Sequence, residues 1–547
     1  MMKDNVIVIG SGLGGLECGY ILARHGFRVT VLEQDKHIGG CMQTFRRRGS
    51  DGTAHTFDTG FHYVGGLAEG QCLHPLFRYL GLMDLPWIRL DDNCFDEVVF
   101  AGNSALESGN GGVRRFPFAA GPERFVERLS ERFPEQKDNL KQYAGFLKGV
   151  GDNIFRAFSP DSDMNGLFSR SAYEFLSETI SDPLLRDVLS GTSLKLELDR
   201  DTLPLYEFAQ INNSFIQSAW RLGTACASDS SDMLSGGALI ADRLASSIRA
   251  MGGTILTRAR VTSIKVNADC TAAGVNVLFS GMGGLASGNA SETSGEEFLP
   301  ADWIISDAHP AVTVNLIEEC KAVRKIYRKR IAGLRNTRGM FTANIVLKPG
   351  VLPYINRNIF VHRSGADLWT PDGSKTDSVM VHFYPPAVSS GLSGGLRSAD
   401  EGICIDLLSP MSAEWDGAWE EARPKHRGEE YEALKQKKLD ECIDLADNGL
   451  RELLGGRSLR ECIDTAYTSS PLTWQSYTGS PDGSAYGIMK DWKNPMATVL
   501  SPRTPLPNLL MTGQSLNLHG VLGVSMTSVL TSSCILGMDT LVREILP

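Results

Sequence analysis

The chain has 547 residues, of which 42% are hydrophobic and 22% are charged, and its formal net charge is −10. This length predicts two or more domains, and the composition is that of an ordinary globular protein. The negative charge argues against nucleic acid as a partner, and no apolar run is long enough to cross a bilayer. The 11 cysteines show no C-x-x-C spacing, which predicts reduced thiols, no metal site and a cytoplasmic location. A strand expected from residue 5 leaves no room for a signal peptide.

The N-terminal segment predicts a dinucleotide-binding unit. An apolar strand over residues 5–9 precedes Gly10, Gly12 and Gly15, which fit the pattern G-x-G-x-x-G, and a helical pattern follows. The first glycine forms a tight turn, the second lets the backbone approach a pyrophosphate, and the third lets the helix pack on the strand. The helix N-terminus offers free N–H groups to the phosphates. The next strand ends in Glu33, a carboxylate that can accept hydrogen bonds from an unphosphorylated ribose.

Further motifs occur in order along the chain. They are GGCMQT at residues 39–44, FDTGFHYVGG at 57–66, LSGGAL at 234–239, PLTW at 471–474 and GSAYG at 483–487, followed by a C-terminal strand–glycine–helix segment. With the N-terminal unit, they resemble the motifs of the flavoprotein family of phytoene desaturases, carotenoid cis–trans isomerases and all-trans-retinol 13,14-reductases. The resemblance runs from residue 5 to about residue 540, and FDTGFHY looks closest to the reductase and isomerase branch. It implies a non-covalently bound FAD.

The C-terminal segment is expected to hold the reactive end of the flavin. An apolar strand over residues 509–511 leads to Gly513, and a glycine turn over residues 520–523 opens a helix. The positive end of that helix dipole would favour negative charge on the N1–C2=O edge of a reduced flavin. The alternative is a strand–turn–helix that only closes the Rossmann domain. Gln514 stands where many relatives have an acid, so the charge of that position is missing here.

The motifs and the resemblance together predict the FAD contacts. A backbone group near Val261, on a strand beside the dinucleotide, is expected to contact the adenine. The complete set of expected cofactor-binding residues is Gly10, Ser11, Gly12, Gly14, Gly15, Glu33, Gln34, Gly39, Gly40, Gln43, Thr44, Gly60, Phe61, Val261, Gly513, Gln514, Leu522, Gly523 and Val524.

We expect an α/β fold in which a discontinuous Rossmann-type FAD-binding domain is interleaved with an α+β substrate domain. The FAD-binding domain takes residues 1–66, 231–320 and 495–547, and the substrate domain takes residues 67–230 and 321–494. Helices are expected over residues 122–133 and 429–454, and a hairpin tip rich in Gly, Ser and Glu over residues 280–297. Residues 203–220 are proposed as an exposed apolar entrance for substrate, with a buried helix pair as the alternative.

Hydride transfer belongs to flavin N5, but saturation of a carbon–carbon double bond also needs a proton. His62, Tyr63 and Tyr486 lie in segments that the family places near the isoalloxazine, as do His519 and Tyr477. The first three are the catalytic candidates. A histidine beside a glycine turn is, however, often only a structural hydrogen-bonding group. Asp58 is expected to brace its loop.

The predicted activity is FAD-dependent saturation or desaturation of an apolar, polyene-like substrate of the carotenoid, retinoid or isoprenoid type. Three alternatives remain open: redox-neutral cis–trans isomerisation, amine oxidation, and a non-catalytic prenyl or lipid carrier. Glu33, the pair Gly39-Gly40 and the C-terminal turn argue against the carrier. The single dinucleotide fingerprint predicts no dedicated NAD(P)H site, and the electron partner is open. Contact with membranes is expected to be peripheral, weak and little affected by salt.

Overall fold

The structure is a computed structural model. It describes residues 4–102, 112–152, 154, 165–230, 232–280, 296–370, 375–385, 404–415, 417–420 and 426–546. Most of the predicted hairpin tip at 280–297 therefore lies outside the described residues.

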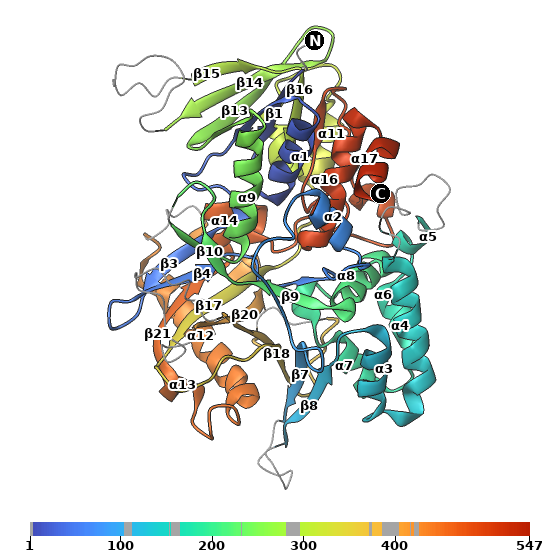
Figure 1. Ribbon diagram of the computed structural model, residues 1–547, viewed down its shortest axis with the longest axis vertical. Coiled ribbons are helices and arrows are strands. Elements are labelled where there is room, and N and C mark those ends of the chain that lie inside the picture. The colour runs from blue at the N-terminus through green and yellow to red at the C-terminus, as the bar shows by residue number, and fades with distance from the viewer. Residues whose placement is uncertain are drawn as a thin grey trace.

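A five-stranded parallel sheet forms the upper part of the molecule in Figure 1. Its strand order is β12-β2-β1-β16-β22, and every neighbouring pair is parallel. The strands are β1 (Asn5–Ile9), β2 (Arg28–Leu32), β12 (Thr254–Leu256), β16 (Trp303–Ser306) and β22 (Leu509–Met511). They come from three separate stretches of the chain, in the manner expected of a discontinuous Rossmann-type domain.

Helices α1 (Leu13–Arg24), α9 (Gly237–Ala250) and α16 (Gly520–Leu536) pack beside this sheet, with α1 in contact with both of the others. Close packing requires small residues at the contacts. A Cβ at Gly19 would lie 3.1 Å from Ile248 Cδ1 of α9, and a Cβ at Gly15 would overlap the carbonyl oxygen of Gly10. The sequence thus fixes α1 close to the end of β1, which positions the glycine turn between them.

A three-stranded antiparallel sheet covers the strands of the Rossmann domain. It consists of β13 (Ala259–Val266), β14 (Ala272–Phe279) and β15 (Glu296–Pro300). Val261 of β13 shares a buried apolar cluster with Ile9 and Leu32, the last residues of β1 and β2. This packing brings β13 to the edge where the Rossmann strands end.

The second large sheet has seven strands in the order β21-β17-β20-β19-β18-β7-β8. It is mixed, because β18 runs parallel to β7 whereas the other neighbours are antiparallel. The strands are β7 (Asp96–Ala101), β8 (Arg114–Phe118), β17 (Gly339–Leu347), β18 (Asn358–Arg363), β19 (Ser378–Phe383), β20 (Cys404–Met411) and β21 (Ile463–Ser469). Helix α12 (Gly428–Leu450), predicted over residues 429–454, packs on one face of this sheet.

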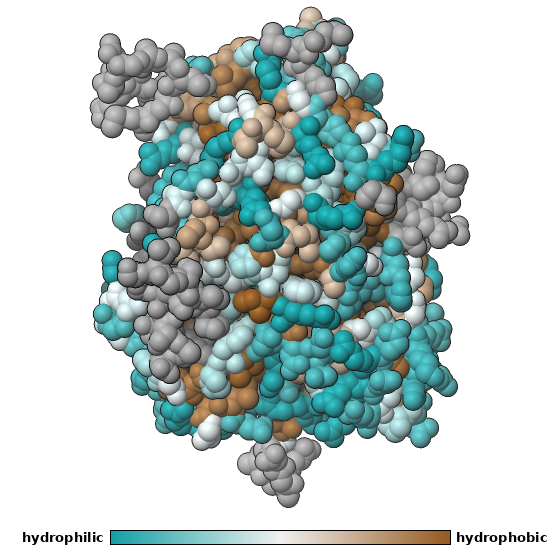
Figure 2. All heavy atoms as spheres, in the orientation of Figure 1, coloured by the Kyte–Doolittle hydropathy of each residue, from teal (hydrophilic) through white to brown (hydrophobic). Residues whose placement is uncertain are grey.

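A group of helices occupies the lower right of Figure 1. Among them, α3 (Pro122–Ser130) and α4 (Lys137–Gly151) carry much of the hydrophilic surface on the face shown in Figure 2. Helix α8 (Leu205–Gln217) contacts α4. Its side chains are almost all buried, with Tyr206 and Phe208 each 1% exposed. The proposed apolar entrance at residues 203–220 is therefore wrong. The alternative, a buried helix pair, is right about burial, but the segment forms one helix followed by strand β9 (Ala219–Leu222).

Shorter elements connect these layers. They are β3 (Thr44–Arg48), β4 (Ala54–Asp58), β5 (Val64–Gly65), β6 (Trp87–Arg89), β9 (Ala219–Leu222), β10 (Thr224–Cys226), β11 (Met233–Ser235), α2 (His74–Tyr79), α5 (Asn165–Phe168), α6 (Ala172–Thr179), α7 (Pro183–Ser190), α10 (Pro310–Leu316), α11 (Lys325–Ala332), α13 (Leu459–Cys462), α14 (Pro471–Thr478), α15 (Pro495–Thr498) and α17 (Met538–Ile545). In the part of the chain that the structure describes, no helix is long and apolar enough to cross a membrane.

Candidate active site

The glycine turn between β1 and α1 forms a cradle of backbone groups. Gly10 has φ +94°, a conformation that glycine adopts without strain. Gly12 is the residue before α1 and has no side chain to cap the helix. The backbone N–H groups at this helix start are the kind that bind phosphate oxygens. Gly40 (φ +54°) closes the cradle from the other side, because a Cβ there would lie 3.3 Å from Gly12 Cα.

Glu33 lies directly beside this turn, at the end of β2. Its Oε2 accepts hydrogen bonds from the backbone N–H of Ser11 (3.0 Å) and from Ser11 Oγ (2.5 Å), and its Oε1 accepts one from Asp35 N–H (2.8 Å). The carboxylate is 8% exposed. Its position agrees with the ribose role predicted from the spacing, and its hydrogen bonds also fix the turn. Gln34, the next residue, lies near Gly479.

Two loops bring the middle group of expected cofactor residues to the same place. The short 3₁₀ helix η1 (Gly40–Met42) follows Gly39, which has φ +113°. Gly60 N–H donates to the carbonyl oxygen of Cys41 (2.9 Å), so the loop that carries Gly60 and Phe61 lies against this turn. Gln43 Nε2 donates to the carbonyl oxygen of His37, and Thr44 begins β3.

The C-terminal segment meets the N-terminal glycine turn. A Cβ at Gly14 would lie 3.1 Å from Gly513 Cα, so Gln514 follows directly on this contact. Helix α16 begins at Gly520, and Leu522, Gly523 and Val524 are buried in its first turn. Glycine segments from both ends of the chain thus lie side by side. The set fits FAD, because the cradle, the acid at the end of β2 and a second helix N-terminus are all present.

Asp307 was not predicted from the sequence, although it belongs to this cradle. It follows β16 directly and is half-buried. Its Oδ1 would lie 2.6 Å from a Cβ at Gly14 and 2.7 Å from a Cβ at Gly513. Burial raises the pKa of its carboxyl group to about 7, although the N–H groups of Gly15 and Gly12 act in the opposite direction.

The hydroxyl group of Tyr63 is held by other polar groups of the core. It donates to Asp96 Oδ2 (3.0 Å), which also receives Lys195 Nζ at 2.7 Å. Burial and the adjacent Asp96 carboxylate raise the pKa of Tyr63 well above its usual value. A phenol in this state is a poor proton donor, so the structure gives Tyr63 the role of a structural hydrogen-bonding group.

Tyr486 is held in a similar way. Its hydroxyl donates to the carbonyl oxygen of Leu194 (2.6 Å), and burial raises its pKa. Its ring packs on His519 at 4.4 Å between centroids. His519 immediately precedes α16, and its Nδ1 lies 2.9 Å from Glu207 Oε1 while its Nε2 lies 3.0 Å from the carbonyl oxygen of Lys195. Tyr477, by contrast, is 55% exposed.

His62 has a different environment. Its Nε2 is buried and has no hydrogen-bond partner among the residues that the structure describes. This atom lies 3.6 Å from Asp406 Oδ2, and its ring meets that of His382 edge to face at 5.1 Å. Of the three catalytic candidates, only His62 has a polar side-chain atom without a hydrogen-bond partner among the described residues. It is the candidate best placed to carry a proton.

Asp406 is fully buried and belongs to β20 of the seven-stranded sheet. It accepts hydrogen bonds from Asn344 Nδ2 (2.7 Å) and from the hydroxyl of Tyr384 (2.5 Å). Tyr384 in turn accepts one from the backbone N–H of Asp58 (2.8 Å). Asp58 accepts one from Gly237 N–H (3.1 Å), which confirms that it braces its loop. Asp406 and Asn344 were not predicted as site residues from the sequence. Their only signal there is that each is a polar side chain inside an otherwise apolar strand.

Burial and the nearby Arg221 guanidinium lower the pKa of His382 well below its usual value, so this ring is neutral. The imidazole of His62 thus lies between the Asp406 carboxylate and a neutral ring.

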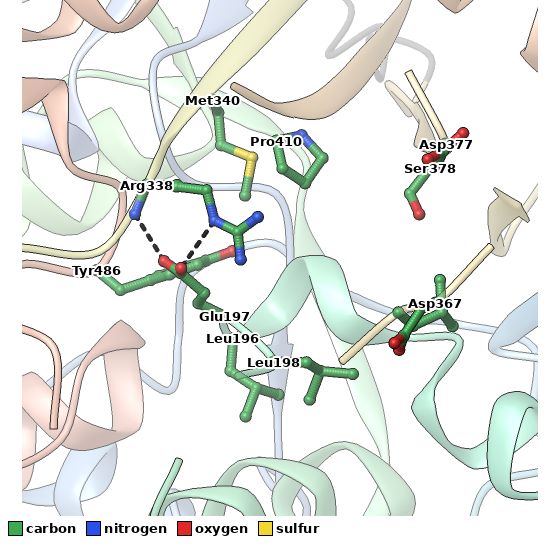
Figure 3. A pocket seen from close by; sticks show the side chains of 11 residues that line it. Leu196, Glu197, Leu198, Arg338, Met340, Asp367, Asp377, Ser378, Pro410 and Tyr486 are labelled. Carbon is green, nitrogen blue, oxygen red and sulfur yellow. Dashed lines mark hydrogen bonds and ion pairs between the residues drawn. The ribbon is translucent and has the colours of Figure 1, made fainter. Parts of the chain in front are cut away.

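A small cavity lies beside Tyr486 (Figure 3). Its volume is about 40 Å³. Glu197 and Arg338 form an ion pair in it, with Glu197 accepting hydrogen bonds from Arg338 N–H (2.6 Å) and Nε (2.8 Å). The apolar side chains in its lining are Leu196, Leu198, Met340, Leu368 and Pro410.

Comparison with known proteins identifies relatives along nearly the whole chain. The family described as NAD(P)-binding Rossmann-like domain matches residues 8–80. The all-trans-retinol 13,14-reductase of Rattus norvegicus is 26% identical over 570 residues, covering 98% of this chain and 86% of the relative.

Solved structures show the same fold at lower identity. An oxidoreductase from Methanosarcina mazei has a TM-score of 0.58 at 16% identity, covering 96% of this chain and 98% of its own. Cyclohexylamine oxidase from Brevibacterium oxydans has a TM-score of 0.55 at 17% identity, covering 98% and 99%. The α/β fold with a Rossmann-type FAD-binding domain is thereby confirmed.

Proposed function

Because this chain belongs to the flavoprotein family of the all-trans-retinol 13,14-reductases and is an FAD-dependent oxidoreductase, we propose that it saturates a carbon–carbon double bond. The proposed substrate is an apolar polyene of the retinoid type. The named activity of the relatives supports both the reaction direction and the substrate class.

The observation that carries this proposal is the pairing of His62 with Asp406. Bound FAD, when reduced, supplies a hydride to the substrate. An unpolarised double bond also needs a proton on its second carbon, and the chain has to provide it. His62 Nε2 has no hydrogen-bond partner among the described residues and faces the Asp406 carboxylate.

Asp406 acts on His62 as a positioning residue. It has no exposed surface, and hydrogen bonds from Asn344 and Tyr384 occupy it from the side of the sheet. Asp406 Oδ2 also lies 3.6 Å from His62 Nε2. The carboxylate therefore orients the ring of His62 from a fixed position in the sheet.

The hydroxyl groups of the other two catalytic candidates already donate hydrogen bonds within the protein. The hydroxyl groups of Tyr63 and Tyr486 donate to Asp96 and to a backbone carbonyl, and transfer of either proton would leave a buried phenolate. These two tyrosines are therefore assigned to the support of the site and not to proton transfer.

The direct test of substrate class is anaerobic mixing of the reduced holoprotein with separate solutions of all-trans-retinol, a carotenoid, a prenyl alcohol and an amine. The proposal predicts saturable reoxidation of the flavin absorbance by retinol, and no reoxidation by the amine. Amine oxidation is tested separately with oxidised holoprotein under anaerobic conditions. Reduction of its flavin by the amine would contradict the proposal. A fully flavinated protein that none of the polyenes reoxidises would contradict it as well.

A further inference from the structure

The cradle between β1 and α1 holds a carboxyl group at the place where a phosphate is expected. The Asp307 carboxyl would be overlapped by a Cβ at Gly12, and it lies 2.6 Å from the Cβ position of Gly14 and 2.7 Å from that of Gly513. The N–H groups of Gly15 and Gly12 hydrogen-bond to it. The missing side chains of these glycines thus make room for Asp307 as well as for a cofactor.

The surroundings of Asp307 are acidic. Glu33 faces it from the end of β2, and Glu17 faces it from α1. The thiols of Cys18 on α1 and of Cys41 on η1 also lie in its field, and burial raises the pKa of Cys18 to about 12 and that of Cys41 to about 11. These thiols are neutral near pH 7, so they offer Asp307 no counter-charge.

Asp307 as a whole residue is half-buried. A bound dinucleotide would cover it and would place a doubly charged pyrophosphate at the same helix N-terminus. An ionised Asp307 would then be desolvated beside a like charge without a compensating cation. A protonated Asp307 would avoid this repulsion and could donate a hydrogen bond to a phosphate oxygen.

We propose that the apoprotein binds FAD with Asp307 protonated, so that FAD binding takes up a proton and weakens as the pH rises. The proposal concerns the cofactor site alone and does not depend on the substrate or the reaction direction. The ionised Asp307 carboxylate and the pyrophosphate compete for the same N–H groups, so ionisation of Asp307 weakens FAD binding.

The sign follows from linkage. In the apoprotein the pKa of Asp307 is about 7, and the bound pyrophosphate raises it further. Below both values FAD binds the protonated form freely. Between the apo and the holo value, each pH unit weakens binding by up to about tenfold.

The test is a titration of apoprotein with FAD between about pH 6 and pH 9, followed by flavin fluorescence, with calorimetry in two buffers of different ionisation enthalpy. For the wild-type protein we expect the dissociation constant to rise at least tenfold from about pH 6.5 to pH 8.5, with net proton uptake. For Asp307→Asn we expect a nearly constant dissociation constant that is lower than that of the wild type at the upper pH.

Glu17→Gln is the matched control. Glu17 is a second buried acid close to Asp307, but it lies on the side of α1 that faces α16 and accepts a hydrogen bond from Ser525 Oγ (2.6 Å). Its replacement should leave the pH dependence of FAD binding in place. A pH-independent wild type, a Glu17→Gln variant that alone loses the dependence, or weaker binding by Asp307→Asn at every pH would overturn the proposal. Absence of proton uptake in calorimetry of the wild type would also contradict the proposal.

Discussion

At His62, a buried ring nitrogen faces a carboxylate that two other groups already hold in place. His62→Gln should lower the rate of product formation by about 10²–10⁴-fold, the usual contribution of a positioned acid. FAD content and the flavin spectrum should be unchanged. Single-turnover kinetics with reduced protein measures this rate. Tyr486→Phe is the control, because its hydroxyl serves a backbone carbonyl, and a rate loss as large as that of His62→Gln would show that the wrong donor was assigned.

The role of Asp406 as a positioning residue predicts a loss of rate without a loss of FAD. Asp406→Asn keeps a group that can bond Tyr384 but removes the carboxylate that faces His62. Single-turnover product formation should therefore slow while FAD content and the unfolding temperature stay close to those of the wild type. Loss of FAD or of stability together with the rate would indicate that Asp406 supports only the fold.

Glu33 accepts hydrogen bonds that fix the glycine turn, and it is also expected to bind the ribose of FAD. Glu33→Ala should weaken FAD binding by roughly 1–3 kcal/mol with little change in the flavin spectrum, because a ribose contact lies far from the ring. Ser11→Ala removes the hydrogen bond of Ser11 Oγ to Glu33 but keeps the carboxylate. Equal loss of FAD affinity in both variants would mean that Glu33 acts by bracing the turn.

The site residues that sequence reasoning found and those that it missed differ in how far apart along the chain their partners lie. Gly10, Gly12, Gly15 and Glu33 lie within one local strand–turn–helix–strand unit, where fixed spacing determines their positions. Asp307 and Asp406 reach the site from β16 and β20, so only the pairing of distant strands brings them there. No spacing rule describes such contacts. A polar residue inside an apolar strand marks such a position but not its partner.

Among the elements, α1 and α4 offer a matched pair of glycine substitutions. A Cβ at Gly15 would overlap the carbonyl oxygen of Gly10, whereas a Cβ at Gly145 of α4 would meet nothing within 4 Å. Gly15→Ala should destabilise the protein by about 1–3 kcal/mol and weaken FAD binding. Gly145→Ala should stabilise it by about 0.5–1 kcal/mol, because alanine is the better helix residue. Thermal unfolding of both variants checks this, and shifts in the same direction would refute the packing argument.

The segment that forms helix α8 was expected at the surface, but the structure buries it. The apolar residues of the 203–220 segment do belong to a helix, but contacts with α4, α6 and β5 bury it on several sides. Periodicity describes one face of a helix, and burial on every face comes from neighbours that are distant in sequence. Strand β22, expected over residues 509–511, was recognised because a short apolar run beside a turn glycine is typical of a parallel sheet.

At the scale of the molecule, buried acids make stability depend on pH. Burial raises the pKa of Glu17 from 4.5 to about 8, so the folded state holds a proton that the unfolded state loses above pH 4.5. This contribution to stability is fully present below pH 4.5 and is lost as the pH rises to about 8. Glu17→Gln removes this loss, so its apoprotein should unfold at a higher temperature than the wild type near pH 8. A variant with the unfolding profile of the wild type would show that Glu17 ionises freely.

The substrate domain completes the site that the Rossmann domain begins. His62 stands on a loop that follows β4, whereas Asp406, His382 and Asn344 stand on strands of the seven-stranded sheet. In the proposed reaction, FAD binding would depend on the Rossmann domain, and the proton would depend on the contact between His62 and the seven-stranded sheet.

The central claim is saturation, and the mass of the product of one anaerobic turnover tests it most directly. Reduced holoprotein mixed with an excess of all-trans-retinol should yield one product molecule per FAD, heavier than the substrate by two hydrogen atoms, as the flavin becomes oxidised. A product of unchanged mass, formed while the flavin stays reduced, would contradict the account and indicate isomerisation.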